Sequence, residues 1–161
     1  MAHADGTRER ALMALNRDFV GRTYAAAQPY EVSRVKIREF AAAIGDNNPI
    51  YRDKSAAQAA GHPDVVAPPT FPIVFSLQSG GEALADPDLG LNLAMVVHGE
   101  QRFEYARPIY AGDELVTRST ITDIHSAGRN ELLTLRSEIT TLAGEPVCTT
   151  YNTIVERGGA G

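Results

Sequence analysis

Little in this sequence points to the cell exterior or to a membrane. Its 161 residues contain one cysteine, Cys148, and no tryptophan. A single thiol excludes a disulfide within the chain and fits a reducing compartment, so we expect a cytoplasmic location. No run of about 18 apolar residues occurs, which predicts that the chain has no membrane-spanning helix. The first residues, MAHADGTRERALMALN, also lack the apolar centre of a secretory signal.

The motifs of common cofactor-binding and nucleic-acid-binding proteins are missing as well. The formal net charge is −5 and no basic run stands out, which argues against a nucleic-acid partner. The sequence has no Cys/His spacing for zinc, no GxxxxGK[ST] and no GxGxxG. We therefore expect no bound metal and no other cofactor.

The length and composition favour one globular domain. Hydrophobic residues make up 43% of the chain, and neither a linker nor an internal repeat is visible. Residues 1–16 are polar and alanine-rich, so we expect a flexible N-terminal segment there. The predicted domain covers residues 17–157, and residues 158–161 form a loose tail.

Helical signals dominate the first half of the chain. A short strand is predicted at residues 28–33, and Ser33 can cap a helix from Arg34 to Ile44 that ends at Gly45. Residues 53–61 predict a second, shorter helix, with Asp53 as its cap and Gly61 as its end. The apolar face of the first helix consists of Ile37, Phe40, Ala41 and Ile44.

A third helix is predicted over residues 71–84. Thr70 can act as its N-cap, and Pro72 falls in the first turn, where a missing N–H costs little. This helix is the longest apolar one, so a sheet must cover it. The preceding APPT segment is expected to be extended, because a residue before proline avoids helical geometry.

The second half of the chain alternates with the period of two that is typical of strands. We predict strands at residues 93–106, 114–125, 131–142 and 146–156, with SAGRN and LAGEP as hairpin turns. Early helices followed by a long antiparallel meander indicate the α+β class. We therefore expect a bent antiparallel sheet that wraps around helix 71–84.

One short stretch, IGDNNPIY at residues 44–51, suggests chemistry. It places Gly45, Asp46, Asn48 and Pro49 after a helix end, and a short alanine-rich helix follows it. This arrangement resembles the G-D-x-N-P-x-H motif of the MaoC-like (R)-specific enoyl hydratases and dehydratases. Tyr51 stands where that motif has its histidine.

Two further stretches extend the resemblance over roughly residues 20–156. GHPDVVAPPTFPIVF is similar to the segment that leads into the central helix of a hotdog fold, and VVHGEQRFEYARPIYAGDEL is similar to the strand and turn that follow. The resemblance implies a single hotdog domain of the N-terminal type, FAS1-like among these dehydratases. That type includes the non-catalytic subunits of heterodimeric (3R)-hydroxyacyl-ACP dehydratases, which shape the acyl-chain tunnel.

A tyrosine cannot simply replace a histidine in this reaction. Dehydration of a 3-hydroxyacyl thioester removes a proton from C2 and delivers one to the leaving hydroxyl, which an imidazole and a carboxylic acid can share. A phenol has a pKa of about 10, so it supplies little phenolate near neutrality. We predict Asp46, Asn48 and Tyr51 as the catalytic set of an incomplete site.

Substrate-binding positions are predicted on both sides of the third helix. Backbone N–H groups around Pro69, Thr70 and Phe71 could polarise the thioester carbonyl. His98, like His62, could reach the site as a displaced base, although local hydrogen bonding or solvent exposure is the simpler interpretation of both. Asp46 could also serve only a local turn, and Tyr51 could be a packing residue.

Three functions fit these residues. The first is a dehydratase or hydratase subunit that binds the acyl chain and depends on a related partner with the complete Asp/His pair. The second is a self-sufficient homodimeric (R)-specific hydratase that uses Asp46 with Tyr51 or a displaced histidine. The third is a non-enzymatic acyl-thioester-binding protein. A thioesterase fits poorly, because the nearest acid, Glu82, falls near the end of helix 71–84.

The resemblance also implies the partners. The substrate would be an acyl-ACP or an acyl-CoA thioester, and the chain would form a homodimer or a heterodimer with a related hotdog subunit. Acyl carrier proteins are usually acidic, so a docking surface should be locally basic. Arg102, Arg107 and Arg118 are the nearest candidates in the sequence, without forming a clear cluster.

Overall fold

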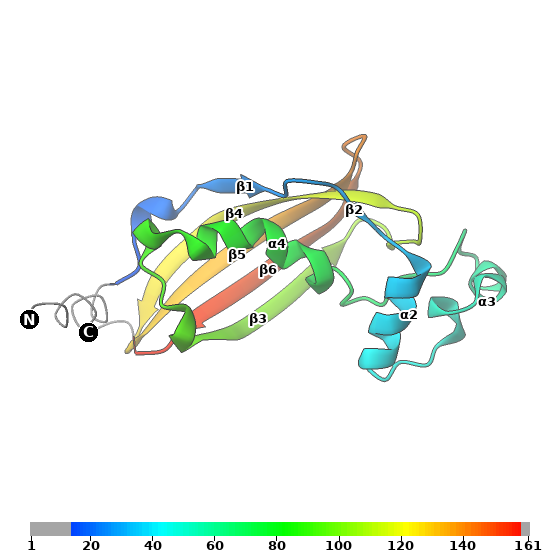
Figure 1. The fold of residues 1–161 in the computed structure, drawn as a ribbon, viewed down its shortest axis with the longest axis horizontal. Helices are drawn as coiled ribbons and strands as arrows, with labels where there is room; N and C mark the ends of the chain where they lie inside the picture. Colours follow the sequence, from blue (N-terminus) through cyan, green and yellow to red (C-terminus); the bar gives the residue numbers. More distant parts are fainter. Residues whose placement is uncertain (1–13, 159–161) are drawn as a thin grey trace, which may run out of the picture.

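The protein folds around one six-stranded antiparallel sheet, as Figure 1 shows. The structure is a computed structural model, and it describes residues 14–158. The strands follow the order β1-β4-β5-β6-β3, with β2 also paired to β4. They span Thr23–Ala25 (β1), Tyr30–Glu31 (β2), Val96–Tyr105 (β3), Glu114–Ala127 (β4), Asn130–Thr141 (β5) and Pro146–Glu156 (β6).

The two short helices form where their capping residues predict them. Helix α2 spans Arg34–Ala43, and the Ser33 hydroxyl accepts a hydrogen bond from the Lys36 N–H. Helix α3 spans Lys54–Ala59, and the Asp53 carboxylate accepts from the Ala56 N–H. Both helices end at glycines with positive φ, Gly45 and Gly61. These predictions are confirmed, because caps and left-handed glycines act within four residues of the helix end.

The long central helix begins later than the sequence predicts. Helix α4 spans Ile73–Ala85, Pro72 precedes it, and no side chain caps it. The predicted cap at Thr70 is therefore wrong. The chain instead makes a turn in which the Phe71 N–H donates to the Pro68 carbonyl at 2.9 Å. Phe71 precedes a proline, and such residues avoid helical geometry.

The predicted meander is confirmed for the last three strands, β4, β5 and β6, but it is wrong for the first predicted strand, β3. β4, β5 and β6 are consecutive neighbours, whereas β3 pairs with β6 at the opposite edge of the sheet. The other side of β4 is occupied by β1 and β2, and β1 was not predicted. Residues 93–95, predicted as strand, form a 3-10 helix. Alternation reveals which residues are extended but not which strand lies beside them.

Helix α4 lies along one face of the bent sheet, so the fold is the predicted α+β hotdog (Figure 1). Its buried face consists mostly of small residues, which brings the helix axis close to the strands. A Cβ atom on Gly80 would lie 2.8 Å from Cδ1 of Leu135. Beside this contact, the Ser79 hydroxyl lies 2.5 Å from that of Ser119, which lies 2.7 Å from that of Ser137. The hydroxyl chain satisfies these buried polar groups.

At the N-terminal end, two residues before the predicted start of the domain at residue 17 are packed against it. Most of the expected flexible segment lies outside the described residues, but Leu15 is only 3% exposed and the Asn16 N–H donates to the Leu89 carbonyl. At the other end, the Gly158 N–H donates to the Asn130 side chain, and residues 159–161 lie outside the described part. No helix within residues 14–158 is long and apolar enough to cross a membrane.

The close seating of α4 can be tested with two neighbouring glycines. A Cβ on Gly81 meets no atom within 4 Å, whereas one on Gly80 would overlap Leu135. Both glycines lie inside α4, so valine changes the helix propensity equally at each. We expect Gly80→Val to lower the free energy of unfolding by about 1–3 kcal/mol relative to Gly81→Val, because it overpacks the core. Urea denaturation of both variants measures this difference, and equal stabilities would contradict the close approach.

Candidate functional site

The GDNNPIY loop is built at the C-terminal end of α2. Gly45 has a φ of +73°, and the Asp46 N–H donates to the Ala41 carbonyl at 2.9 Å, which ends the helix. The Asp46 carboxylate then accepts from the Asn48 N–H at 3.0 Å, and the Asn48 side chain accepts from the Ile50 N–H at 3.2 Å. Two successive turns of this kind carry the chain into the 3-10 helix η3, Pro49–Tyr51.

These turns direct Tyr51 into the core. Its side chain is only 8% exposed and packs within a cluster that includes Val65, Val66 and Phe71. No hydrogen bond to its phenol occurs among the described residues. The packing interpretation of Tyr51 therefore describes its position well.

Electrostatics make Tyr51 a poorer base than an ordinary tyrosine. Burial raises its pKa above the usual value, and the nearby charge of Asp46 raises the pKa further. The structure thus brings Asp46 and Tyr51 together as a carboxylate beside a neutral phenol. Such a pair can accept and donate hydrogen bonds, but at neutral pH the phenol cannot remove a proton from carbon.

The Pro69–Phe71 segment is held in place rather than open to a ligand. Phe71 is fully buried against Phe40 and Phe75, and its N–H is used in the turn to Pro68. Thr70 is exposed, and its carbonyl accepts from the Ile73 N–H at 3.2 Å. One of the predicted carbonyl-polarising N–H groups, that of Phe71, is therefore already used within the turn. A role for Pro69, Thr70 and Phe71 in substrate binding stays a prediction.

Tyr105 is a residue near this segment that sequence analysis missed. Its hydroxyl donates to the Pro69 carbonyl at 2.8 Å, which ties the end of β3 to the start of the central helix. Burial raises the pKa of its phenol well above the usual value, so the hydroxyl remains a donor. An aromatic residue at a strand end carries no sequence signal for such a contact.

Neither of the two candidate histidines, His62 and His98, is shown to complete the site. The His62 ring is half-buried, and its Nδ1 lies 3.3 Å from the Tyr110 hydroxyl. His98 is exposed near the start of β3, at a bulge, seven residues before Tyr105. A strand rises about 3.3 Å per residue, so His98 lies about 23 Å along the strand from Tyr105. The structure does not bring it to the loop of Asp46.

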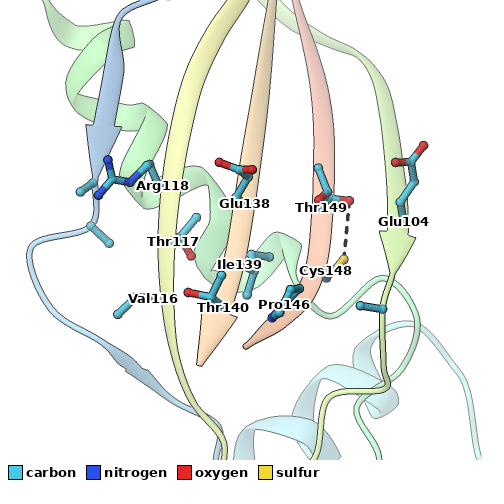
Figure 2. A pocket seen from close by; sticks show the side chains of 13 residues that line it. Glu104, Val116, Thr117, Arg118, Glu138, Ile139, Thr140, Pro146, Cys148 and Thr149 are labelled. Carbon is cyan, nitrogen blue, oxygen red and sulfur yellow. Dashed lines mark hydrogen bonds between the residues drawn. The ribbon is translucent and has the colours of Figure 1, made fainter. Parts of the chain in front are cut away.

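A shallow hollow of about 520 Å³ lies on the outer face of the sheet, away from α4 (Figure 2). A row of side chains from four neighbouring strands crosses it: Arg118, Glu138, Thr149 and Glu104. Burial raises the pKa of Cys148, below this row, to about 11, so its thiol stays protonated. These groups provide neither a nucleophile nor a free base.

Two of the three basic candidates for a docking surface are paired with acidic side chains. Arg107 is paired with Asp113 at 2.9 Å, and Arg102 lies 3.3 Å from Glu104. The ion pairs that brace the motif region lie elsewhere, around Asp64. Arg34 donates two hydrogen bonds to this carboxylate, at 2.9 and 2.6 Å, and Lys54 lies 3.3 Å from it. These contacts join the first residues of α2 and α3.

Within residues 14–158, no group of three or more His, Cys, Asp or Glu side chains is placed to hold a metal ion. The hotdog fold and the GDNNPIY loop define the class of protein instead, a domain of the dehydratase and hydratase type. The chain belongs to the family described as "FAS1-like, dehydratase domain region", whose model matches residues 18–150.

Comparison with known proteins agrees with this assignment. A UPF0336 protein of Thermobifida fusca is 58% identical over 148 residues, which cover 92% of this chain and 97% of that protein. Among solved structures, the C-terminally truncated HadBC (3R-hydroxyacyl-ACP dehydratase) complex of Mycobacterium tuberculosis matches with a TM-score of 0.80. It shares 28% identity over 88% of this chain and 99% of that chain. A MaoC-like dehydratase matches at 0.75 with 34% identity, over 86% of this chain but 42% of that chain.

Tyr51 can be tested as a packing residue. We expect Tyr51→Phe to change the free energy of unfolding by less than about 1 kcal/mol, because the phenol has no partner to lose. Tyr51→Ala should cost about 3–5 kcal/mol, as for other buried aromatic residues. Thermal or urea unfolding of the two variants measures both effects. A large loss in Tyr51→Phe would show that the hydroxyl has a structural partner.

The Asp64 ion pairs predict a dependence of stability on pH. Hydrogen bonds from Arg34, and then from the Val65 N–H and Lys54, hold the pKa of Asp64 well below its usual range. A depressed pKa in the folded state means that the carboxylate stabilises the fold above the unfolded pKa near about 4, and that this stabilisation is lost as pH falls. We expect Asp64→Asn to be less stable than wild type at pH 7, with the difference shrinking below about pH 4. A difference independent of pH would contradict the ion pairing.

Proposed function

We propose that this chain is a subunit of a (3R)-hydroxyacyl thioester dehydratase, and that it binds the acyl chain beside a related subunit with a complete Asp/His pair. The observation that carries the proposal is Tyr51. It occupies the histidine position of the family motif, lies buried beside Asp46, and has a pKa raised above that of an ordinary phenol. The partner complex and a cytoplasmic location are parts of the same proposal.

The chemistry explains why a partner is needed. Loss of water from a 3-hydroxyacyl thioester breaks the C2–H and C3–O bonds, forms the C2–C3 double bond and releases the hydroxyl as water after protonation. One group must take the C2 proton, and one must deliver a proton to the hydroxyl. Asp46 could serve one role, but the Tyr51 phenol cannot serve the other as a base near neutrality. A histidine in the partner's own site can act as that base.

The edge of the sheet offers a surface for such a partner. β3 is the last strand in the sheet order, so one of its sides has no neighbour within the described residues. Unpaired strand edges invite pairing with another chain. Exposed apolar side chains lie on and just before this strand, and one more lies on α4: Leu93, Met95, Val97, Tyr105 and Leu77. Similarity to the HadBC complex supports an edge-to-edge dimer with a related subunit.

Activity measured with and without a partner tests the proposal. We expect the purified chain alone to show little or no hydration of crotonyl-CoA. Co-expressed with a genomic neighbour that carries the D-x-N-P-x-H motif, it should co-purify as a complex with a kcat of about 1–10³ s⁻¹. A chain that reaches this range alone would contradict the incomplete site, and Asp46→Ala, His62→Ala and His98→Ala would then locate its base.

Matched variants of the complex assign the roles of the two subunits. Replacing the motif histidine of the partner by alanine should lower kcat by about 10²–10⁴. Asp46→Ala in this chain should leave most of the activity, because the reaction takes place in the partner's site. A loss of similar size in both variants would show that both motifs take part in catalysis.

A further inference from the structure

A bulge in β3 turns His98 onto the inner face of the sheet. Strand alternation alone would place His98 on the same face as Glu100, two residues later. The register between β3 and β6 shifts between these two residues, however, so that His98 lies opposite Ile154. Ile154 in turn lies opposite Leu133, which is fully buried in a core cluster with Ala83 of α4. The bulge therefore directs His98 to the face of the sheet that α4 covers.

This bulge is built into the packing of β3 on β6. Gly99 is the residue that has no partner in the register of the two strands. A Cβ atom at this glycine would lie 2.7 Å from Cγ2 of Val155 and 3.3 Å from the carbonyl oxygen of Thr153, so only glycine fits. Bulges at sheet edges re-aim a side chain, and they are frequent next to active sites. Here the side chain that is re-aimed is an imidazole.

The His98 imidazole has no partner within its own chain. Among residues 14–158, its ring makes no hydrogen bond, whereas the rings of His62 and His125 contact Tyr110 and Asp123. Helix α4 packs mainly on β4, β1 and β5, and it leaves His98 exposed at the β3 edge. The inner face of the sheet thus presents a free hydrogen-bonding group at the edge where the related subunit is proposed to pair.

Antiparallel pairing of two β3 edges reverses the position of His98 relative to the motif end. In its own chain, His98 lies seven residues, about 23 Å, before Tyr105. A related subunit that pairs over the full ten residues of β3 places the end of its strand beside the start of this one. His98 then lies opposite the partner position equivalent to Phe103, about 7 Å along the strand from the one equivalent to Tyr105. Directly opposite residues project from the same face, so both lie on the inner face.

The end of β3 belongs to the motif end of the fold. Phe103 packs against the core cluster that contains Tyr51 and Phe71. The Tyr105 hydroxyl donates to the Pro69 carbonyl, just before α4 begins. In a related subunit with the same fold, the equivalent positions lie beside that subunit's own Asp/His motif and the start of its central helix.

We propose that His98 acts across the subunit interface, where its imidazole donates a hydrogen bond to the carbonyl oxygen of the acyl thioester bound in the partner's site. The proposal rests on the proposed function, because it needs a related partner that carries the complete Asp/His pair. Removal of the C2 proton moves negative charge onto this carbonyl oxygen, and a fixed N–H donor stabilises that charge. This chain then contributes a substrate contact to the partner's reaction, although its own motif is incomplete.

Disulfide trapping tests the placement of His98. His98→Cys is combined with a cysteine at the partner position equivalent to Phe103, and the complex is oxidised under mild conditions. Two cysteines join when their Cα atoms lie about 4.4–6.8 Å apart, so we expect a covalent heterodimer. Arg129→Cys, an exposed position in the β4–β5 turn, is the matched control and should not be trapped. No trapping at this partner position, nor at any position within two residues of it, would overturn the placement.

Turnover of the complex tests the contact with the substrate. We expect His98→Ala to lower kcat for the hydration of crotonyl-CoA by about ten- to thousandfold, with little change in KM. His98→Asn keeps an N–H donor and should recover part of the rate. His125→Ala removes an exposed histidine of β4 and should behave as wild type. With assembly of each complex confirmed by light scattering, an unchanged kcat in His98→Ala, or a change in KM alone, would overturn the contact.

The two measurements together separate this proposal from the proposed function. A complex that is trapped through residue 98 but does not hydrate crotonyl-CoA as wild type keeps the placement of His98 and contradicts the dehydratase function, and with it the contact. An active complex in which His98→Ala has the kcat of the wild type keeps the function and contradicts the contact.

Discussion

The close contact between helix α4 and the sheet organises the molecule. Gly80 lets the helix approach Leu135, and the serine chain from Ser79 through Ser119 to Ser137 satisfies the polar groups that this approach buries. A tightly seated helix leaves no room for an acyl chain between itself and the sheet at this point. Under the proposed function, an acyl chain therefore has to lie elsewhere than between Gly80 and Leu135.

Another part of the core, around Phe71 and Phe75, determines what the GDNNPIY loop can do. Helix α4 and the Pro69–Phe71 turn carry Phe71 and Phe75 into the core, and Tyr51 packs against the cluster that they form. The side chains of Asp46 and Asn48 accept hydrogen bonds from backbone N–H groups in the turns that lead to Tyr51. A motif that can carry acid–base chemistry is used here to place an aromatic side chain in the core. This use agrees with a subunit that contributes shape and binding rather than a base.

Charge and apolar surface are separated around this core. The cations that contact Asp64 lie on α2 and α3, and these helices lie beyond one end of the sheet (Figure 1). Most of the exposed apolar side chains of the β3 edge, Leu93, Met95 and Val97, lie before or at the start of that strand.

The sequence by itself determined the features that depend on near neighbours. Ser33, Asp53 and Gly45 set the ends of α2 and α3, since a cap acts on N–H groups two or three residues away. Alternating side chains marked β4, β5 and β6, and one contiguous motif brought Asp46, Asn48 and Tyr51 together, because seven residues of loop cannot separate them. Tertiary structure alone decided that β3 lies beside β6, that Thr70 does not cap α4, and that Arg34, Lys54 and Asp64 share one ion-pair group. It also placed His98 at the far end of its strand. Such pairings depend on which surfaces pack over long separations in the chain, and neither strand alternation nor capping encodes the partner across that distance.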